Sequence, residues 1–227
     1  MITISYCTTC KGRLWQLKQT LGVNLKAIRG LKGVDLVLLD YHSEDGMKDW
    51  VFNNFLDDIN SEKLKYYRLK EDKYFDMSFA KNIAHNLASS DILFNLDADN
   101  FIGTTVNELF LLKENEILIS HPTFIRETNS WGRWGRIGIY AKQFHELRGY
   151  DEDIEGMGCD DGNFILRASR KRIRLQYSND TSQPIPNTAQ DKIVNCNPVT
   201  KHYQPMLLKD HVNQLGYGCA ESIRIRY

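Results

Sequence analysis

The ten residues from 91 to 100, Asp-Ile-Leu-Phe-Asn-Leu-Asp-Ala-Asp-Asn, constrain the fold of this chain most strongly. The apolar part, residues 92–96, is short and rich in β-forming side chains, which predicts a strand buried on both faces within a mostly parallel sheet. Directly after this run the chain presents Asp97 and Asp99. Ligands of open α/β sheets bind beyond the carboxyl ends of the strands, so we expect both acids at a binding site.

Asp97 and Asp99 have the chemistry of a divalent-cation site. Two carboxylates one residue apart can turn toward one ion where the irregular backbone at a strand end breaks the alternation of side chains. Without a cation the two charges repel by roughly 4 kcal/mol at contact distance and an effective dielectric of about 20. Their hard oxygen ligands suit Mg2+ or Mn2+ that bridges to a phosphate. The alternative is an ordinary surface turn.

The composition is that of a globular protein, with 42% hydrophobic and 26% charged residues in a chain of 227. A chain of this length buries about 70% of its extended surface, so we expect one domain over residues 1–227. Lysine plus arginine and aspartate plus glutamate both number 29, so no global field favours nucleic acid. The densest basic run, residues 167–174, is expected to be a solvated helix end, with a membrane-surface or phosphate contact as the alternative.

No apolar run approaches the roughly 18 residues that cross a bilayer, and the N-terminus lacks the pattern of a secretory leader. We therefore expect a cytoplasmic protein. Five cysteines, odd in number and scattered, fit a reducing compartment. Cys7 and Cys10 have C-x-x-C spacing, but a zinc site would need a second close pair, which leaves a redox role as the alternative.

Apolar periodicity alternates between strand-like and helix-like segments, which predicts an α/β fold with a central mostly parallel sheet flanked by helices. Strands are predicted over residues 2–6, 34–39, 64–69, 92–96, 116–120, 137–140 and 173–177. Helices are predicted from Leu14 onward, over 47–59, over 77–88 after an Asp76 cap, over 104–113, over 142–147 and from Phe164 onward. Between them we expect a polar turn at 7–12, an irregular aromatic stretch at 121–136 and a mobile flap at 178–200.

A second acidic stretch, residues 148–164, leads into the last predicted helix. Six carboxylates crowd into residues 151–161, interrupted by glycines. Asp160 and Asp161 fall at the N-terminus of the helix, where the ionised form is favoured. An ionised carboxylate opposite a metal-bound diphosphate is well suited to act as a general base. Plain helix capping is the alternative, but capping alone would not need so many acids and glycines.

Polar and aromatic side chains outside the two acidic stretches are further candidates. Lys81 and Asn82, near the start of their predicted helix, could reach a ligand at the sheet edge or simply form the polar face of the helix. Trp131 and Trp134 lie among glycines and could plug the core or stack on a sugar face. In the C-terminal part, a histidine could complete a metal site or serve as a structural hydrogen-bonding group.

In their order and spacing, these segments resemble the nucleotide-sugar-dependent glycosyltransferases of the GT-A fold. The resemblance is to the bacterial family 2 type in particular, with a galactosyltransferase-like C-terminal module, and it covers roughly residues 2–211. The matching segments are Cys-Thr-Thr-Cys-Lys-Gly-Arg at 7–13, Leu-Asp-Tyr at 39–41, Ala-Lys-Asn at 80–82, Leu-Asp-Ala-Asp at 96–99, Arg-Gly-Tyr-Asp-Glu at 148–152 and Gly-Met-Gly-Cys-Asp-Asp at 156–161. The resemblance implies a GT-A (Rossmann-like) sheet, with a nucleotide-binding half over 1–100 and an acceptor-binding half over 101–227.

The resemblance also implies roles for residues in the first half of the chain. The nucleoside of the donor would lie against Thr8, Arg13 and Asp40. Its ribose and diphosphate would be supported by Lys81 or Asn82. The donor implied in this way is a UDP-sugar.

The metal site implied by the resemblance centres on the D-x-D motif, Asp97-Ala98-Asp99. In the family this motif binds the diphosphate of the donor through Mn2+ or Mg2+. His202 would complete the metal shell from the C-terminal part of the chain, with His211 as the alternative.

The catalytic base of inverting members corresponds to Asp161, with Asp160 as the alternative. Cys159-Asp160-Asp161 stands where galactosyltransferases usually have Gly-Glu-Asp, so the choice between the two aspartates and the identity of the donor sugar stay open. Trp131 and Trp134 would bind the acceptor.

Together these expectations describe a metal-dependent inverting glycosyltransferase. It would move galactose or N-acetylgalactosamine from UDP to a glycan or lipid-linked saccharide, for a bacterial surface polysaccharide made at the inner face of the membrane, with peripheral membrane contact. A nucleotidyltransferase is one alternative, but it normally has a glycine-rich phosphate loop, and residues 7–13 contain one glycine. A non-catalytic sugar-nucleotide or glycan-binding module is the other alternative, and it would tolerate loss of the base.

Overall fold

The structure is a computed structural model that describes residues 1–202, residue 209 and residues 212–225. The strands are β1 (Ile4–Cys10), β2 (Val34–Asp40), β3 (Leu64–Leu69), β4 (Ile92–Asn95), β5 (Glu116–Ser120), β6 (Ile137–Tyr140), β7 (Arg174–Ser178) and β8 (Ser222–Arg224). The helices are α1 (Leu14–Ile28), α2 (Met47–Asn60), α3 (Met77–Asn86), α4 (Thr105–Leu111), α5 (Pro122–Thr128), the 3-10 helix η1 (Trp131–Arg133), α6 (Ala141–Glu146), α7 (Asp160–Arg170) and α8 (Ala189–Ile193).

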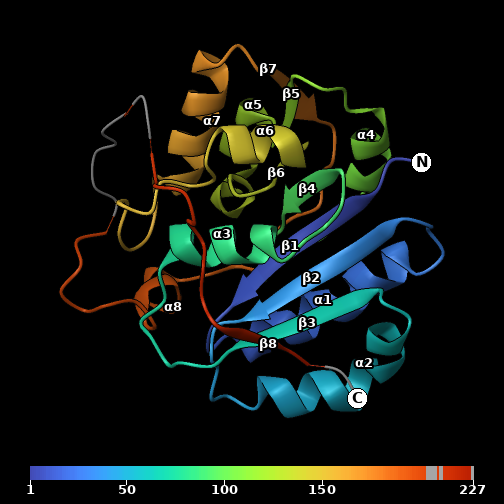
Figure 1. Cartoon of the computed structure of the whole chain (residues 1–227), viewed down its shortest axis with the longest axis vertical. Helices are drawn as coiled ribbons and strands as arrows, with labels where there is room; N and C mark the ends of the chain where they lie inside the picture. Colours follow the sequence, from blue (N-terminus) through green and yellow to red (C-terminus); the bar gives the residue numbers. More distant parts are fainter. Residues whose placement is uncertain (203–208, 210–211, 226–227) are drawn as a thin grey trace.

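The predicted α/β fold with a mostly parallel sheet is confirmed. Across the described residues one sheet runs in the order β7-β5-β6-β4-β1-β2-β3-β8, from the top to the bottom of Figure 1. Strand β1 pairs in parallel with β2 and β4, β2 with β3, and β5 with β7. Strand β6 runs antiparallel to β4 and β5, and β8 runs antiparallel to β3. The carboxyl ends of β1 to β4 therefore meet at one edge of the sheet.

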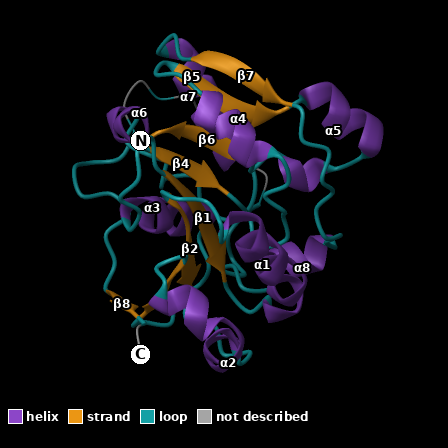
Figure 2. Ribbon diagram, turned by 90° about the vertical axis from the view of Figure 1, so that its right-hand side faces the viewer, coloured by secondary structure: helices purple, strands orange, loops and turns teal. Residues whose placement is uncertain are grey.

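Helices cover both faces of this sheet, with α1 and α4 on one side and α3 and α6 on the other (Figure 2). The strand side chains alternate accordingly. Tyr6 of β1 belongs to the apolar cluster under α1, whereas Cys7 packs with the residues of α3. The central parallel strands are thus buried on both faces, which explains their continuous apolar runs.

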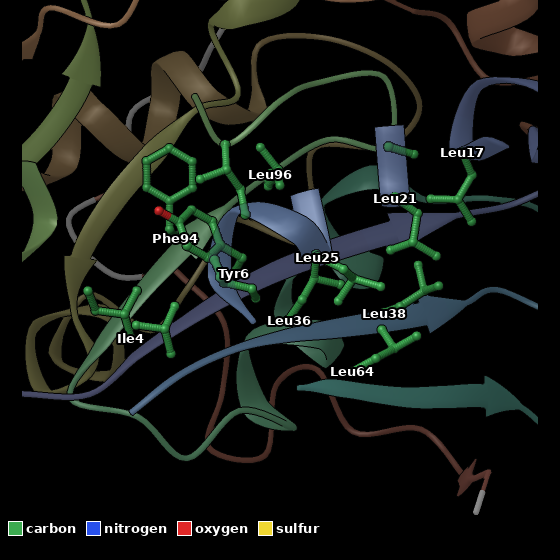
Figure 3. Close-up of a cluster of buried hydrophobic side chains, with 14 of the residues drawn as sticks. Ile4, Tyr6, Leu17, Leu21, Leu25, Leu36, Leu38, Leu64, Phe94 and Leu96 are labelled. Atoms are coloured by element: carbon green, nitrogen blue, oxygen red, sulfur yellow. The ribbon is translucent and has the colours of Figure 1, made fainter. Parts of the chain in front are cut away.

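The first helix forms because its leucines recur at helical spacing. Leu17, Leu21 and Leu25 lie one turn apart and are buried in the same cluster as Leu36 and Leu38 of β2 (Figure 3). Burying a leucine side chain contributes about 1.5–3 kcal/mol. This packing fixes the N-terminal end of α1 next to the end of β1, where the chain turns.

The polar turn predicted at residues 7–12 is wrong for most of its length, because β1 continues to Cys10. The pairing with β2 extends to Cys10 opposite Asp40. Thr8 is buried within this ladder, and small or β-branched side chains fit a pleated surface covered on both sides. The chain turns only at Lys11 and Gly12, and the φ of +60° at Gly12 favours glycine.

The stretch 121–136 is more regular than expected, since it contains α5 and η1. Pro122 stands at the start of α5, where its missing N–H costs no helical hydrogen bond. Asn129 ends α5 in the left-handed conformation, with a φ of +53°. The apolar periodicity of this stretch is weak because only Ile125 of α5 is buried.

The segment 178–200 also contains a helix that its sequence pattern does not predict. Thr188 and Asp191 form a capping box at the start of α8, with both reciprocal hydrogen bonds present. None of the residues of α8 is fully buried, so the helix lacks the apolar periodicity by which helices are recognised. The mobility of this segment stays a prediction.

The basic run 167–174 is only partly the solvated helix end that we expect. Arg167 is buried, and its guanidinium donates to the carbonyl oxygens of Leu147 and Gly149 at 2.7 and 2.6 Å. Residues 170–172 are exposed, as expected. Arg167 is buried, unlike residues 170–172, because it faces the loop that precedes α7.

The remaining predicted elements are present, several with shifted ends, and β8 is an additional strand. Strands β3, β5 and β6 have the predicted bounds. Asp76 caps α3 as predicted, because its side chain accepts a hydrogen bond from the backbone N–H of Phe79 at 2.9 Å. In the part of the chain that the structure describes, no helix is long and apolar enough to cross a membrane.

Candidate active site

A cavity of about 440 Å3 lies where β1 and β4 end. Its walls come from the turn after β1, the turn after β4, the first turns of α3 and α7, the stretch around η1, and the segment that contains α8. These six parts are distant in sequence, and the parallel strands bring them together because their carboxyl ends share one edge of the sheet.

The cavity brings together the two acid pairs that the sequence singles out. Asp97 and Asp99 line its β4 side, and Asp160 and Asp161 line it from the N-terminus of α7. The loop before α7 turns through Cys159, whose φ of +71° is left-handed. This turn directs the first two side chains of the helix toward the end of β4.

Asp97 and Asp99 are held by neutral amides in the described residues. Asn95 donates to Asp97 Oδ1 at 3.0 Å, and Asn100 donates to Asp99 Oδ1 at 2.8 Å. Asn187 donates to Asp99 Oδ2. Burial, together with the nearby charge of Asp97, raises the pKa of Asp99 to about 6. Among the described residues neither carboxylate forms an ion pair, although the charge of Arg13 acts on Asp99, so both keep oxygen atoms that a divalent ion could bind.

The glycine at position 135 leaves room for the carboxylate of Asp97. A Cβ atom at Gly135 would lie 2.2 Å from Asp97 Oδ2, so any side chain there would displace the carboxylate. The carbonyl oxygen of Gly135 also accepts a hydrogen bond from Asn95 at 2.6 Å. The close approach of this backbone fixes the position of Asp97 at the cavity wall.

Asp160 and Asp161 share one lysine. Lys81 Nζ lies 2.5 Å from Asp160 Oδ2 and 2.7 Å from Asp161 Oδ1. Burial opposes the charge of Lys81, but the two carboxylates outweigh it and raise the pKa of the ammonium group. Burial and the charge of Asp160 raise the pKa of Asp161 to about 7. One of the two acids can thus change its protonation state near neutral pH.

Arg13 lines the cavity next to the end of β1. Its Nε donates to the carbonyl oxygen of Asp191 at 3.0 Å, and its Nη1 lies 3.4 Å from Gln16 Oε1. Its Nη2 is buried and has no hydrogen-bond partner among the described residues. An unsatisfied buried donor costs about 1–3 kcal/mol, so this atom is a candidate contact for an anionic ligand.

Three of the predicted donor-binding residues do not line the cavity. Thr8 is buried within β1, and Thr9 and Cys10 line the cavity instead. Asp40 is fully buried behind the cavity, where it accepts hydrogen bonds from Arg68 and Tyr66 at 2.5 and 2.7 Å.

Asn82 is the third of these residues, and it is directed away from the cavity. Its amide donates to the carbonyl oxygen of Tyr150 at 2.9 Å and to Glu152 Oε1 at 2.8 Å. Its Oδ1 accepts from the backbone N–H of Tyr150 at 2.7 Å. Asn82 therefore ties α3 to the acidic loop, while its neighbour Lys81 reaches the cavity.

Both tryptophans predicted to bind the acceptor line the cavity. Trp131 is half-exposed, whereas Trp134 packs partly against the apolar cluster under α6 and α7. The loop that carries them is anchored by Arg133 and Arg136, two buried arginines that contact Asp180 of the segment 178–200. Trp131 therefore offers an apolar face at a fixed place on the rim.

The segment 178–200 forms one wall of the cavity, and it supplies site residues that the sequence analysis does not identify. Asn187, Lys192 and Asn195 line the cavity, and Asn195 donates to the carbonyl oxygen of Lys11 at 2.7 Å. Their signal in the sequence is indirect, because only the expectation of a flap over the site points to this segment.

Of the two histidines predicted to complete a metal shell, the structure describes His202 alone. His202 Nδ1 accepts a hydrogen bond from the backbone N–H of Met157 at 3.2 Å, and His202 does not line the cavity. His211 lies outside the described residues. Within the described part of the chain, no group of three or more His, Cys, Asp or Glu side chains could hold a metal ion. The roles of both histidines stay predictions.

The sheet order and the cavity at its edge define the class of fold: this is the GT-A fold of nucleotide-sugar glycosyltransferases. No family model matches the chain. No curated protein matches it in sequence either. The placement of the chain in family 2, and its galactosyltransferase-like module, therefore stay predictions.

Three solved structures illustrate the likeness, each with 14% sequence identity. The chain is similar to the mannosyltransferase PcManGT from Pyrobaculum calidifontis in complex with GDP-mannose and Mn2+, with a TM-score of 0.66 over 83% of this chain and 58% of that one. It is similar to TarS from S. aureus in complex with UDP, with a TM-score of 0.61 over 83% and 61%. It is also similar to Drosophila β-1,4-galactosyltransferase 7 in complex with manganese, UDP-galactose and xylobiose, with a TM-score of 0.55 over 85% and 74%. The chain thus spans less than two thirds of the length of the first two proteins.

Proposed function

We propose that this chain is a metal-dependent, inverting glycosyltransferase that moves a sugar from a UDP-sugar to a saccharide acceptor. One observation carries the proposal, namely that the acid pair after β4 and the acid pair at the start of α7 line the same cavity. A nucleotide-sugar transfer needs a cation for the leaving diphosphate and a base for the acceptor, and these two pairs supply the groups for both.

The acid pair after β4 fits a divalent cation. Asp97 and Asp99 offer hard oxygen ligands that receive only neutral amide hydrogen bonds in the described residues. Mn2+ or Mg2+ held there would stabilise the negative charge that develops on the leaving diphosphate. Arg13 lines the same cavity after the neighbouring strand β1, and its Nη2, which has no hydrogen-bond partner among the described residues, can donate to a phosphate oxygen.

Asp161 is the proposed base. In an in-line displacement the acceptor oxygen forms a bond to the anomeric carbon, the bond from that carbon to the diphosphate breaks, and the acceptor proton passes to Asp161. Attack from the face opposite the leaving group inverts the configuration of the sugar carbon. Asp161 suits this task because it lines the cavity and has a pKa close to the working pH.

For the donor we propose UDP-galactose or UDP-N-acetylgalactosamine, and for the acceptor a glycan or a lipid-linked saccharide. The resemblance to galactosyltransferases supports this donor, and the likeness to a galactosyltransferase crystallised with UDP-galactose and xylobiose agrees with it. The half-exposed Trp131 at the rim supports a saccharide acceptor, because sugars stack on indole faces. Synthesis of a bacterial surface polysaccharide at the inner membrane face is proposed from the resemblance alone.

The proposal is tested by following UDP release from UDP-galactose and UDP-N-acetylgalactosamine in the presence of Mn2+. GDP-mannose and UDP-N-acetylglucosamine serve as competing donors. Turnover of a UDP-sugar that EDTA abolishes, with an inverted sugar product by NMR, is the expected result. Binding of UDP without turnover of any donor would favour the non-catalytic module. Consumption of a nucleoside triphosphate with release of pyrophosphate would favour the nucleotidyltransferase.

A further inference from the structure

Lys81 occupies an unusual position, because a single buried ammonium serves two carboxylates on another helix. It lies in the second turn of α3, and its partners Asp160 and Asp161 begin α7, about 80 residues later. The side chain of Lys81 is 1% exposed. Such a group stays charged only because its partners compensate for the lost hydration.

The donors of Lys81 are already engaged. An ammonium group has three N–H donors. Two are directed at Asp160 and Asp161, and Nζ lies 5.0 Å from the centroid of the Tyr150 ring, within the range of a cation–π contact. Although Lys81 lines the cavity, it has at most one N–H group left to bind the phosphate oxygens of a nucleotide sugar.

The two aspartates differ in their access to the cavity. The side chain of Asp160 is 6% exposed, and that of Asp161 is 17% exposed. In the described residues the hydrogen bond that Asp161 receives comes from Lys81 to Oδ1. Asp160 thus serves mainly as a buried partner of Lys81, whereas Asp161 is more accessible to a substrate.

The segment around Lys81 is itself rigidly held. Asp76 caps α3 one turn earlier, and Asn82 binds both backbone groups of Tyr150 in the loop that leads to α7. These contacts hold the start of α3 against Tyr150, so the backbone that carries Lys81 has a fixed position. A side chain fixed in this way orients its partner more precisely than a flexible surface lysine would.

We propose that Lys81 is a positioning residue that holds Asp161 as an oriented base facing the acceptor, with Asp160 as the second carboxylate on the lysine, and that it does not bind the donor diphosphate. This inference rests on the proposed function. It replaces the expectation that Lys81 supports the ribose and diphosphate, and it assigns the roles of the two aspartates.

The two roles make opposite predictions for Lys81→Met. A positioning residue affects the chemical step, so kcat should fall about 10- to 100-fold while the affinity for UDP in the presence of Mn2+ changes by less than about twofold. If Lys81 instead bound the diphosphate, its loss would weaken nucleotide binding, and the dissociation constant of UDP would rise by about the same factor as turnover falls. The latter outcome would overturn the inference.

A second comparison tests whether Lys81 acts through Asp161. In the Asp161→Asn background, the base that Lys81 orients is gone, so adding Lys81→Met should not lower kcat further. Losses that multiply in the double variant would show that Lys81 works independently of Asp161, and would refute the inference. UDP affinity, measured by calorimetry, should be the same in all four proteins.

Two further variants separate a positioning role from a loss of folding. Lys81→Met/Asp160→Asn removes one charge of each sign, so this double variant should fold even if Lys81→Met alone does not. Its kcat should fall about 10- to 100-fold, as expected for Lys81→Met. Wild-type turnover in this double variant would count against the inference. Lys65→Met is the matched control, because Lys65 pairs with Asp35 at 2.7 Å in the sheet and not at the cavity. The same assay first measures the wild type, and absence of donor turnover there would overturn the proposed function itself.

Discussion

The side-chain amide of Asn187 donates a hydrogen bond to Asp99 Oδ2, across 88 residues of sequence. The amide oxygen of Asn187 accepts in turn from Gln16 of α1. The backbone N–H of Ile185 also donates to the carbonyl oxygen of Asp99, at 2.7 Å. The segment 178–200 is therefore fastened directly to the second acid of the D-x-D motif. A cation on Asp99 would have to share this carboxylate with Asn187 or displace it.

Asn187→Ala should therefore ease the binding of the cation. A hydrogen bond is worth about 0.5–1.5 kcal/mol net, so the Mn2+ concentration needed for half-maximal UDP binding should fall about two- to tenfold. Calorimetric titration of UDP at a series of Mn2+ concentrations measures this shift. Asn54→Ala on α2 is the control. A higher Mn2+ requirement would identify Asn187 as a metal ligand and contradict its role as a competitor.

Asp161→Asn should remove the base and leave the donor site intact. We expect kcat to fall about 100- to 10,000-fold, with UDP affinity within about twofold of the wild type. The wild-type pH profile should also report this group. Its pKa in the ligand-free protein is raised to about 7, so the ionised base forms, and kcat/KM rises, as pH increases through that value. Steady-state rates between about pH 5 and pH 9 measure the profile, and Asp57→Asn on the exposed face of α2 is the control. Full activity of the Asp161 variant would refute the assignment.

Asp99→Asn should stabilise the metal-free protein at alkaline pH. The pKa of Asp99 rises from 3.8 to about 6 on folding, so between these values the folded state binds more protons than the unfolded state. The free energy of unfolding of the wild type therefore decreases as pH rises from 3.8 to about 6. An asparagine at position 99 does not titrate, so the variant does not lose this stability. Thermal unfolding in EDTA should show a gain of about 3 kcal/mol for the variant at pH above about 7, and little gain at pH about 4. An equal gain at both pH values would contradict this explanation.

Trp131→Ala should weaken acceptor binding and spare the donor. The indole is half-exposed at the rim of the cavity, so its removal should cost little stability. Loss of a stacking contact of about 1–1.5 kcal/mol predicts a rise of about five- to tenfold in the KM of the acceptor, with the donor KM unchanged. Trp15→Ala is the matched control, because Trp15 is a comparably exposed tryptophan on α1. Equal effects of the two substitutions would remove the proposed role of Trp131.

Gly135→Ala should disturb the cation site through a single methyl group. Its Cβ would lie 2.2 Å from Asp97 Oδ2, so the carboxylate must move. We expect Mn2+-dependent UDP binding to weaken by about tenfold, which corresponds to about 1.4 kcal/mol. Gly30→Ala is the control, because no atom lies within 4 Å of a Cβ placed there. Unchanged Mn2+ dependence in the Gly135 variant would argue against Asp97 as a ligand.

Much of the fold follows from local pattern in the sequence. The apolar run at 92–96 predicts a buried central strand because parallel strands are covered on both faces, and β4 lies in the middle of the sheet. That Asp97 and Asp161 lie close together follows from topology. Asp97 follows the C-terminal end of a parallel strand, and Asp161 is at the N-terminus of a helix, and both of these ends are expected at the same edge of the sheet. Neither inference needs knowledge of side-chain packing.

What could not be predicted depends on details that only packing decides. Strand β1 extends to Cys10, so the cavity receives Thr9 and Cys10, and Thr8 stays inside the sheet. Asp40 looks like a ligand at the end of β2, but Arg68 on the neighbouring strand neutralises it at 2.5 Å. The contact between Asn187 and Asp99 has no local pattern at all, because it joins an aperiodic segment to a distant turn.

The buried contacts of Asp180 restrict how the cavity wall can open. Arg133 and Arg136 share this one carboxylate, and Arg133 also donates to the carbonyl oxygens of Asp180 and Ser182. Lifting the wall from its base would leave two buried guanidinium groups without a counter-charge, which is costly. We therefore expect residues 180–182 to keep their place when a substrate enters, so that any rearrangement of this wall takes place in the residues after Ser182.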